Sequence, residues 1–255
     1  LAIDPTDSHG QGPADYRFTK ASKPVWAKRL PYTLWDATVA DSGRIAGYAY
    51  TCGWNAFETS DSPGEFIVAM LSPEGKILKE ERHARHWSRF LDTPPNPLAS
   101  GTIFDSASER FVVRIFDPDI NRRIERWWLF DLKTAKRLGT LEPGRAMPDR
   151  KSDEALFILA ARAVPGTSLV LIHWWKYTDG DCGGVFTLID LDDAKARSVW
   201  TLALDGDYSV PENEEAEDRI RNRIRAEGAI LDSNKPAAFA IHAVKQSQRI
   251  DFSVK

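Results

Sequence analysis

The residues of this sequence that could do chemistry are carboxylates and aromatic rings placed near the ends of predicted strands. Trp35 is followed directly by Asp36, which sets an indole ring beside a carboxylate. A glycoside hydrolase or lyase needs two carboxylates about 5–10 Å apart, and that pairing is set in space, not by sequence spacing. The carboxylates that could supply the pair are Asp36, Asp117, Asp119, Asp179 and Asp181.

No motif for a metal, a nucleophile or a nucleotide accompanies these carboxylates. Asp117 and Asp119 open like a calcium loop, but Arg122 and Trp128 stand where an EF-hand requires Gly and Glu. The sequence also lacks a Gly-x-Ser-x-Gly elbow, a phosphate-binding glycine loop and a dinucleotide fingerprint. We therefore expect neither a metal nor a cofactor, and the pattern favours a binding protein over an enzyme.

Composition indicates a folded protein with no attraction to polyanions. The 255 residues are 28% charged and 42% apolar with a formal net charge of -3, so we expect no nucleic-acid partner. No apolar run reaches the length of a membrane span. Cys52 and Cys182 could form one disulfide or remain two thiols. The chain opens on Leu1 without an initiator Met, which indicates a processed product or an excised fragment, and no signal peptide is visible, which leaves export open.

Short β-prone runs separated by turn residues predict a series of hairpins. Pro73 and Gly75 illustrate the turn chemistry, since Pro presets φ and Gly tolerates a positive φ. The second turn of each four-strand unit begins near 72, 132 and 192, which is a repeat of about sixty residues. The predicted strands are 36–40, 44–50, 65–71, 76–82, 101–104, 110–116, 125–131, 136–141, 155–163, 168–176, 183–190, 197–204, 237–244 and 249–255.

Two segments fall outside this rhythm. Residues 1–23 are polar and rich in Gly and Pro, and we expect an irregular N-terminal arm. Residues 212–227 follow Pro211 with acidic residues first and arginines last, the order that suits a helix dipole, and predict one surface helix inserted between repeats. The remaining chain, 24–255, is expected to form one repeat domain.

The segment 130–136, Phe-Asp-Leu-Lys-Thr-Ala-Lys, looks like the Asp-Leu-x-Thr-Gly-Lys hairpin of quinoprotein-like and WD40-like β-propellers, and 189–195 is a looser echo. The chain therefore resembles a β-propeller repeat protein. The resemblance implies an all-β fold of four-stranded antiparallel blades, about 3.5–4 repeats, forming a propeller or part of a longer one. The tryptophan-docking motif of quinoproteins is missing, so no quinone cofactor is expected.

Strand parity separates the two ends of the predicted blades. Tight turns all fall at one end, and the longer connections 51–64, 83–99, 117–124, 142–154, 177–182 and 205–236 at the other. Such loops often carry binding residues, and aromatic rings can stack on sugars or on apolar side chains. The predicted ligand-binding residues are Trp35, Asp36, Trp54, Arg122, Arg123, Trp127, Trp174, Trp175, Tyr177 and Asp179. Alternatively, the tryptophans pack under the loops as a collar.

Three functional hypotheses follow from the sequence. The first is a binding or scaffold module that presents an aromatic-rich loop face to a protein partner or a glycan. The second is a carbohydrate-active hydrolase or lyase that uses loop-face carboxylates, and the third is a structural part of a larger propeller. Few cysteines and many aromatics resemble exported bacterial proteins, with the cytoplasm left open, and the sequence carries no signal for an oligomeric state.

Overall fold

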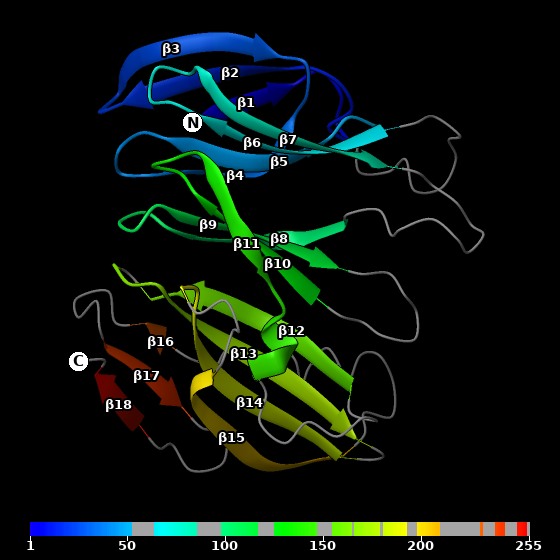
Figure 1. Cartoon of the computed structure of the whole chain (residues 1–255), viewed down its shortest axis with the longest axis vertical. Coiled ribbons are helices and arrows are strands. Elements are labelled where there is room, and N and C mark those ends of the chain that lie inside the picture. Colours follow the sequence, from blue (N-terminus) through cyan, green and yellow to red (C-terminus); the bar gives the residue numbers. More distant parts are fainter. Residues whose placement is uncertain are drawn as a thin grey trace. The chain divides into compact units, whose positions relative to one another are not determined.

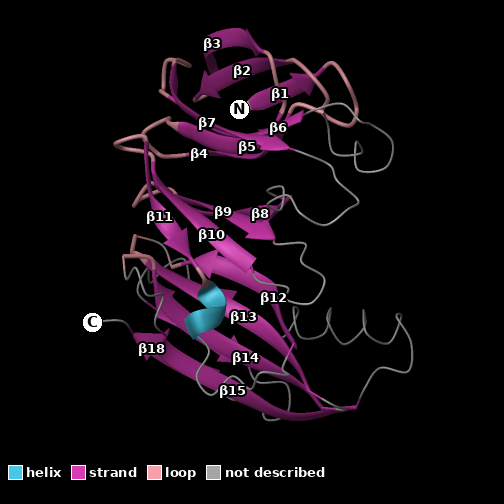
Figure 2. Ribbon diagram, turned by 45° about the vertical axis from the view of Figure 1, so that its right-hand side comes forward, coloured by secondary structure: helices cyan, strands magenta, loops and turns pink. Residues whose placement is uncertain are grey.

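A computed structural model describes residues 1–52, 64–85, 98–116, 125–146, 155–164, 166–178, 181–192, 198–209, 230–231, 238–242 and 249–253. Figure 2 shows that these residues are almost entirely strands, with one short 3-10 turn, η1 (Pro143–Ala146), among them. This part of the chain contains no helix with the length and apolar character needed to cross a bilayer. The helix predicted at 212–227 lies outside the described residues.

The strands form five sheets, each made of strands that follow one another in sequence (Figure 1). The first sheet is β1 (Ala2–Pro5), β2 (Ala14–Lys20) and β3 (Lys23–Leu30). The second is β4 (Leu34–Val39), β5 (Ile45–Tyr50), β6 (Gly64–Leu71) and β7 (Ile77–Arg85). The third is β8 (Leu98–Asp105), β9 (Arg110–Phe116), β10 (Glu125–Asp131) and β11 (Lys136–Leu141).

The fourth sheet has the longest strands, and the fifth has short ones. The fourth is β12 (Ala155–Ala163), β13 (Leu169–Thr178), β14 (Asp181–Asp190) and β15 (Ser198–Ser209). The fifth is β16 (Ile230–Leu231), β17 (Ala238–His242) and β18 (Arg249–Ser253). The predicted hairpins are confirmed, and β10 and β11 have the predicted bounds.

Two sequence-based expectations are wrong. Residues 1–23 are not irregular, because β1 and β2 pair along Ala2–Pro5 and Ala14–Arg17, and the Gly- and Pro-rich residues 6–13 only link them. The glycines and proline of residues 6–13 suggested an irregular segment. The alternating burial of Ala14, Tyr16 and Phe18, which is typical of a strand, was missed. The connection 177–182 is not long, because β13 and β14 stay paired as far as Thr178↔Asp181.

By their internal contacts the residues divide into two compact units. One contains residues 1–122 and 128–139, and the other contains 123–127 and 140–255. In the second unit, η1 lies against β14, and the buried residues come mainly from β13 and β14. Each unit is described by itself below.

In the first unit, the second sheet is buried on both faces. One face of β5 and β6 contributes Ile45, Ala49, Ile67, Ala69 and Leu71 to a cluster shared with the first sheet. The opposite face contributes Ala46, Tyr48, Tyr50, Phe66, Val68 and Met70 to a cluster shared with the third sheet. Successive side chains of a strand point to opposite faces, so an unbroken apolar run is what a sheet between two neighbours needs.

The short link from β3 to β4 is held by a buried tyrosine. Tyr16 Oη donates to the Tyr32 carbonyl at 2.8 Å and accepts from the Leu34 N–H at 2.8 Å. Residues 31–33 leave the last strand of one sheet and enter the first strand of the next, so their backbone cannot join either ladder. The Tyr16 hydroxyl therefore satisfies two buried backbone groups at the crossing between sheets.

The five sheets are made of sequential antiparallel strands, and the first three stack face to face through shared cores, which makes this fold a partial β-propeller. The fold class predicted from the sequence is confirmed. The assignment of 24–255 to one propeller domain, either whole or part of a longer propeller, stays a prediction.

Replacing Ile67 tests the double-sided burial. Ile67 is fully buried, whereas Ile77 on the neighbouring strand is 44% exposed. We expect Ile67→Ala to lower the free energy of unfolding by about 2–5 kcal/mol because it leaves a cavity between the first two sheets. The matched variant Ile77→Ala should change it by less than about 0.5 kcal/mol. Urea unfolding measures both, and equal losses would contradict the arrangement.

The buried tyrosines predict a loss of stability at high pH. Burial raises the pKa of Tyr16 to about 12, partly offset by the hydrogen bond from Leu34, and burial also raises the pKa values of Tyr32 and Tyr48. Unfolded tyrosine titrates near pH 10. Stability should therefore be complete below pH 10 and fall as the pH rises from about 10 to 12, because only the unfolded chain then releases protons.

Tyr16→Phe isolates one of these groups. The variant should be less stable at neutral pH, by about 1–3 kcal/mol, because two buried backbone groups lose their partner. Its urea midpoint should nevertheless fall less steeply between pH 10 and 12 than that of the parent protein. An unchanged slope would show that the Tyr16 phenol does not keep its proton in the folded state.

Candidate binding site on the first strands of two sheets

Asp36 lies in a β-bulge of β4. The strand pairs with β5 at Trp35↔Tyr48 and next at Thr38↔Ala46, so two residues of β4 oppose Gly47 alone. Asp36 has a φ of 48°, in the left-handed region that side chains other than Gly rarely adopt. Gly47 allows the bulge to form, because a Cβ there would lie 3.1 Å from the Ala37 Cα.

The first strand of the third sheet carries a bulge of its own. The register of β8 against β9 shifts between Ala99 and Gly101, and Gly101 has a φ of 139°. The Tyr50 hydroxyl, from the second sheet, accepts a hydrogen bond from the Ala99 N–H at 2.7 Å. A buried side chain thus satisfies a backbone donor beside the bulge and ties the two sheets together.

The two bulges meet at the Asp36 carboxylate. Thr102 Oγ1 donates to Asp36 Oδ2 at 2.8 Å, and a Cβ on Gly101 would lie 3.9 Å from the same oxygen. Among the described residues this is the one hydrogen bond to that carboxylate, and the Asp36 side chain is exposed. The arrangement holds a negative charge in a fixed orientation at the start of β4, where it can accept hydrogen bonds or an ion pair from a ligand.

Trp35, beside Asp36, is covered by the link between β1 and β2. Gly10 has a φ of 70°, and a Cβ there would lie 2.7 Å from Cζ2 and Nε1 of Trp35. Asp7 holds the link in place, because its carbonyl accepts from the Gly10 N–H at 3.0 Å and its carboxylate from the His9 N–H at 2.9 Å. Trp35 is half-buried and packs against the core shared by the second and third sheets, as a collar residue would.

Two other predicted site tryptophans are core residues of their strands. Trp127 is fully buried, and its Nε1 donates to Glu125 Oε1 at 2.7 Å. Trp174 is 3% exposed, and its Nε1 donates to Thr187 Oγ1 at 2.7 Å. With their N–H groups satisfied and their rings covered, these indoles offer no open face to a ligand in this structure.

The remaining predicted site residues are not placed as a site. Trp175 and Tyr177 lie within β13, where they pair with Gly184 and Cys182, and their side chains lie outside the description. Four predicted residues lie wholly outside the described residues: Trp54, Arg122, Arg123 and Asp179. Among those of the ten that the structure describes, Trp35 and Asp36 lie together on β4, and Trp174, Trp175 and Tyr177 share β13.

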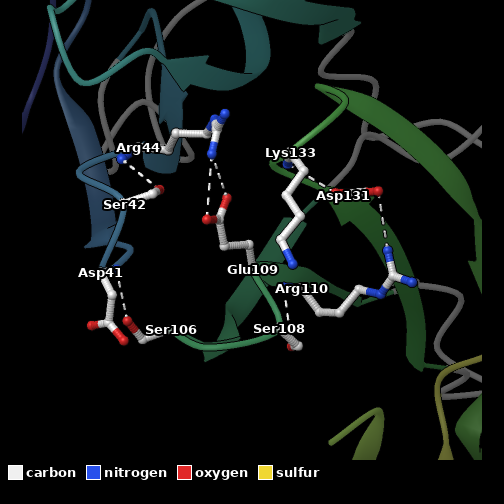
Figure 3. A network of polar contacts seen from close by, with 9 residues as sticks. All are labelled: Asp41, Ser42, Arg44, Ser106, Ser108, Glu109, Arg110, Asp131 and Lys133. Atoms are coloured by element: carbon white, nitrogen blue, oxygen red, sulfur yellow. Dashed lines mark hydrogen bonds and ion pairs between the residues drawn. The ribbon is translucent and has the colours of Figure 1, made fainter. Parts of the chain in front are cut away.

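A second polar cluster lies at the opposite end of the same sheets, where residues of two turns bind one another (Figure 3). Arg44 binds both carboxylate oxygens of Glu109 at 3.1 and 3.3 Å, and the Asp41 N–H donates to Ser106 Oγ at 2.8 Å. These contacts join the β4–β5 turn to the β8–β9 turn. The cluster therefore fixes the second and third sheets against each other. Within the described ranges, no group of three or more His, Cys, Asp or Glu could hold a metal ion.

Sequence reasoning missed Thr102, Gly101 and the covering role of Gly10. The available signal was a glycine beside or within a predicted strand, because Gly47 interrupts an apolar β-run, Gly101 stands between Ser100 and Thr102 at the start of another, and such glycines often mark bulges. Nothing in the sequence indicates that the two bulges face each other, since Asp36 and Thr102 are 66 residues apart.

No family model and no curated protein matches this sequence. Among solved structures, the chain is similar to the propeller of Dos1, with 11% identity and a TM-score of 0.41 over 76% of this chain. It is similar to the β-propeller domain of the Trilobed protease from Pyrococcus furiosus, with 10% identity and a TM-score of 0.38 over 86% of this chain. The rhamnogalacturonan lyase YesW matches with 11% identity and a TM-score of 0.41 over 98%.

The chain covers between 44% and 52% of the length of these three solved chains. At such identities a likeness concerns the fold, and the activities in those descriptions belong to those proteins.

The cover over Trp35 can be tested with two glycines of similar backbone conformation. Gly10 and Gly12 have φ values of 70° and 74°, but a Cβ meets nothing within 4 Å at Gly12. Both alanine variants should lose about 1 kcal/mol for the left-handed conformation. Gly10→Ala should lose about 1–3 kcal/mol more, because its methyl group must displace the Trp35 ring. Urea unfolding compares them, and equal losses would contradict the contact.

Proposed function

We propose that this chain is a binding module whose ligand face lies at the end of the sheets where β4 and β8 begin. The observation that carries the proposal is the Asp36–Thr102 hydrogen bond between two bulged strands, which orients an exposed carboxylate. The ligand is a protein partner or a glycan, since both offer the hydroxyl or cationic donors that a carboxylate accepts.

The backbone at Asp36 supports a role other than folding. A left-handed non-glycine residue is less stable by roughly 1–3 kcal/mol and persists where the surrounding structure imposes it, often at binding sites. Two bulges on neighbouring sheets impose it here, and the exposed carboxylate contributes little burial in return. The longer connections 51–64 and 83–99 leave the second sheet at this same end, so further ligand contacts are expected from them.

A binding role requires less than catalysis does. A carbohydrate hydrolase or lyase would need a second carboxylate about 5–10 Å from Asp36. The other carboxylates proposed for that role, Asp117, Asp119 and Asp179, lie outside the described residues, as does the side chain of Asp181. The enzyme hypothesis therefore stays a prediction from the sequence, and the geometry of Asp36 and Thr102 supports binding.

Asp36→Asn should weaken ligand binding without unfolding the protein. A hydrogen bond to a charged group is worth about 1.5–3 kcal/mol, so we expect roughly a 10- to 100-fold loss of affinity. The matched control is Asp41→Asn, in the turn that follows β4 at the opposite end of the sheet. There the Asp41 backbone N–H, and not its carboxylate, makes the contact with Ser106. Thermal shift against panels of oligosaccharides and of Lys- and Arg-rich peptides identifies the ligand class, and titration calorimetry measures affinity.

A sugar or peptide that binds equally well to the parent protein and to Asp36→Asn would place its site elsewhere. Failure of both panels to raise the melting temperature would reject binding of these two ligand classes. The proposal requires that Asp36→Asn and Thr102→Val each weaken ligand binding. It also requires that Asp41→Asn bind the ligand as well as the parent protein does.

A further inference from the structure

Three hairpins of the first unit carry the same lysine pair. The β2–β3, β6–β7 and β10–β11 turns each hold two lysines three positions apart, and the pairs recur at intervals of 56 and 57 residues. These six residues, here called the hairpin lysines, are Lys20, Lys23, Lys76, Lys79, Lys133 and Lys136. All are exposed except Lys79, which is half-buried.

The exposed apolar side chains lie on the same hairpins. The four large apolar residues that are exposed in the described part of the chain all follow these turns on the last strand of a sheet: Val25 at 49%, Ile77 at 44%, Leu78 at 43% and Leu138 at 47%. Single exposed apolar residues are ordinary, but here each of the three last strands contributes at least one, close to its lysines.

Side-chain contacts hold β3, β7 and β11, the last strands of the first three sheets, side by side. Trp26 Nε1 donates to the Pro73 carbonyl at 2.9 Å, and Lys28 Nζ donates to the Gly75 carbonyl at 2.8 Å, which ties β3 to the β6–β7 turn. Arg137 Nη1 binds Glu81 Oε1 at 2.6 Å, which ties β11 to β7. β3, β7 and β11 therefore lie side by side along one edge of the three sheets, with their hairpins in a row.

This row of hairpins is cationic in a chain of net charge -3. No hydrogen bond or ion pair in the described residues involves the ammonium group of any hairpin lysine. The acidic side chains in these hairpins also have local partners, since Asp131 pairs with Arg110 at 3.3 Å and Glu74 accepts from the Ser72 hydroxyl at 2.7 Å, with the charge of Lys76 a smaller interaction. A simpler interpretation is that the lysines only prevent aggregation through the edge strands. That role does not require exposed Val, Ile and Leu beside them.

We propose that the hairpin lysines and the apolar residues beside them form a second interaction surface, which binds an acidic protein segment that also carries apolar side chains. Packed sheets lie about 10 Å apart, so three successive hairpins span about 20 Å. A helix rises 1.5 Å per residue, so about 14 residues would cross them. This surface lies at the opposite end of the sheets from Asp36 and does not depend on the function proposed above.

An anionic membrane is the other surface that such lysines could meet. Membrane-bound segments insert apolar side chains about 5–10 Å into the lipid interface. The exposed apolar residues here keep about half of their surface against their own sheets, so they cannot reach that depth. A peptide that lies across the strands needs only the exposed half, and the observations favour the protein segment.

The test uses the whole chain and a 16-residue helical peptide with Glu on one face and Leu on the other. We expect it to bind, and we expect Lys23→Gln, Lys79→Gln and Lys136→Gln together to weaken binding by about tenfold and to reduce its dependence on salt. The matched control, Arg17→Gln, Arg126→Gln and Arg162→Gln, removes the same charge from elsewhere and should have little effect. Val25→Ser with Leu138→Ser should also weaken binding while leaving its salt dependence unchanged.

Other outcomes overturn the proposal. Equal weakening by the lysine and arginine variants would show attraction to net charge alone. Absence of binding to the peptide, or binding that all variants retain, would remove the site. The chain could instead sediment with vesicles of phosphatidylserine and phosphatidylcholine, lose that binding in the lysine variant, and fail to bind the peptide. That result would make the ligand a lipid surface and not a protein segment.

Discussion

The burial of the second sheet on both faces is the constraint on which the rest of the first unit depends. β5 and β6 lie between two neighbouring sheets, so every side chain in their centre must be apolar and must fit the space available. A polar group at such a position would lose its hydration without gaining a partner. Polar chemistry is therefore confined to the first and last strands and to the ends of the sheets, where both candidate surfaces lie.

Tyrosine hydroxyls extend this packing to the places where the chain passes between sheets. The Tyr16 hydroxyl forms hydrogen bonds with the backbone where the chain crosses from β3 to β4. The Tyr50 hydroxyl accepts a hydrogen bond from the backbone beside the bulge at the start of β8. In each case the ring belongs to the apolar core and the hydroxyl satisfies backbone groups at or just before the start of the next sheet. The aromatic core thus determines where the strand starts lie, including those that carry Asp36 and Thr102.

Glycine makes the Asp36 arrangement possible. An interior glycine weakens a strand because it has no side chain to pack, yet only glycine at position 47 leaves room for the backbone of the bulge opposite. The stability given up in the strand is offset by the cores on either side. The two ends of the unit consequently differ in chemistry, with an oriented carboxylate at one end and a row of lysines beside apolar side chains at the other.

The sequence by itself determined the strands, their order and the repeat, because turn residues and runs of β-prone residues act locally. It also indicated Asp36, but it placed the tryptophans at or beside strand ends, whereas Trp127 and Trp174 lie inside β10 and β13. The β1–β2 hairpin escaped because glycines and prolines in its link outweighed the alternation of Ala14, Tyr16 and Phe18. Only the tertiary structure decided that Trp127 is buried, that Trp35 lies under Gly10, and that Thr102 reaches Asp36. Those facts depend on how one sheet packs against the next, and residues 66 positions apart carry no local signal of their meeting.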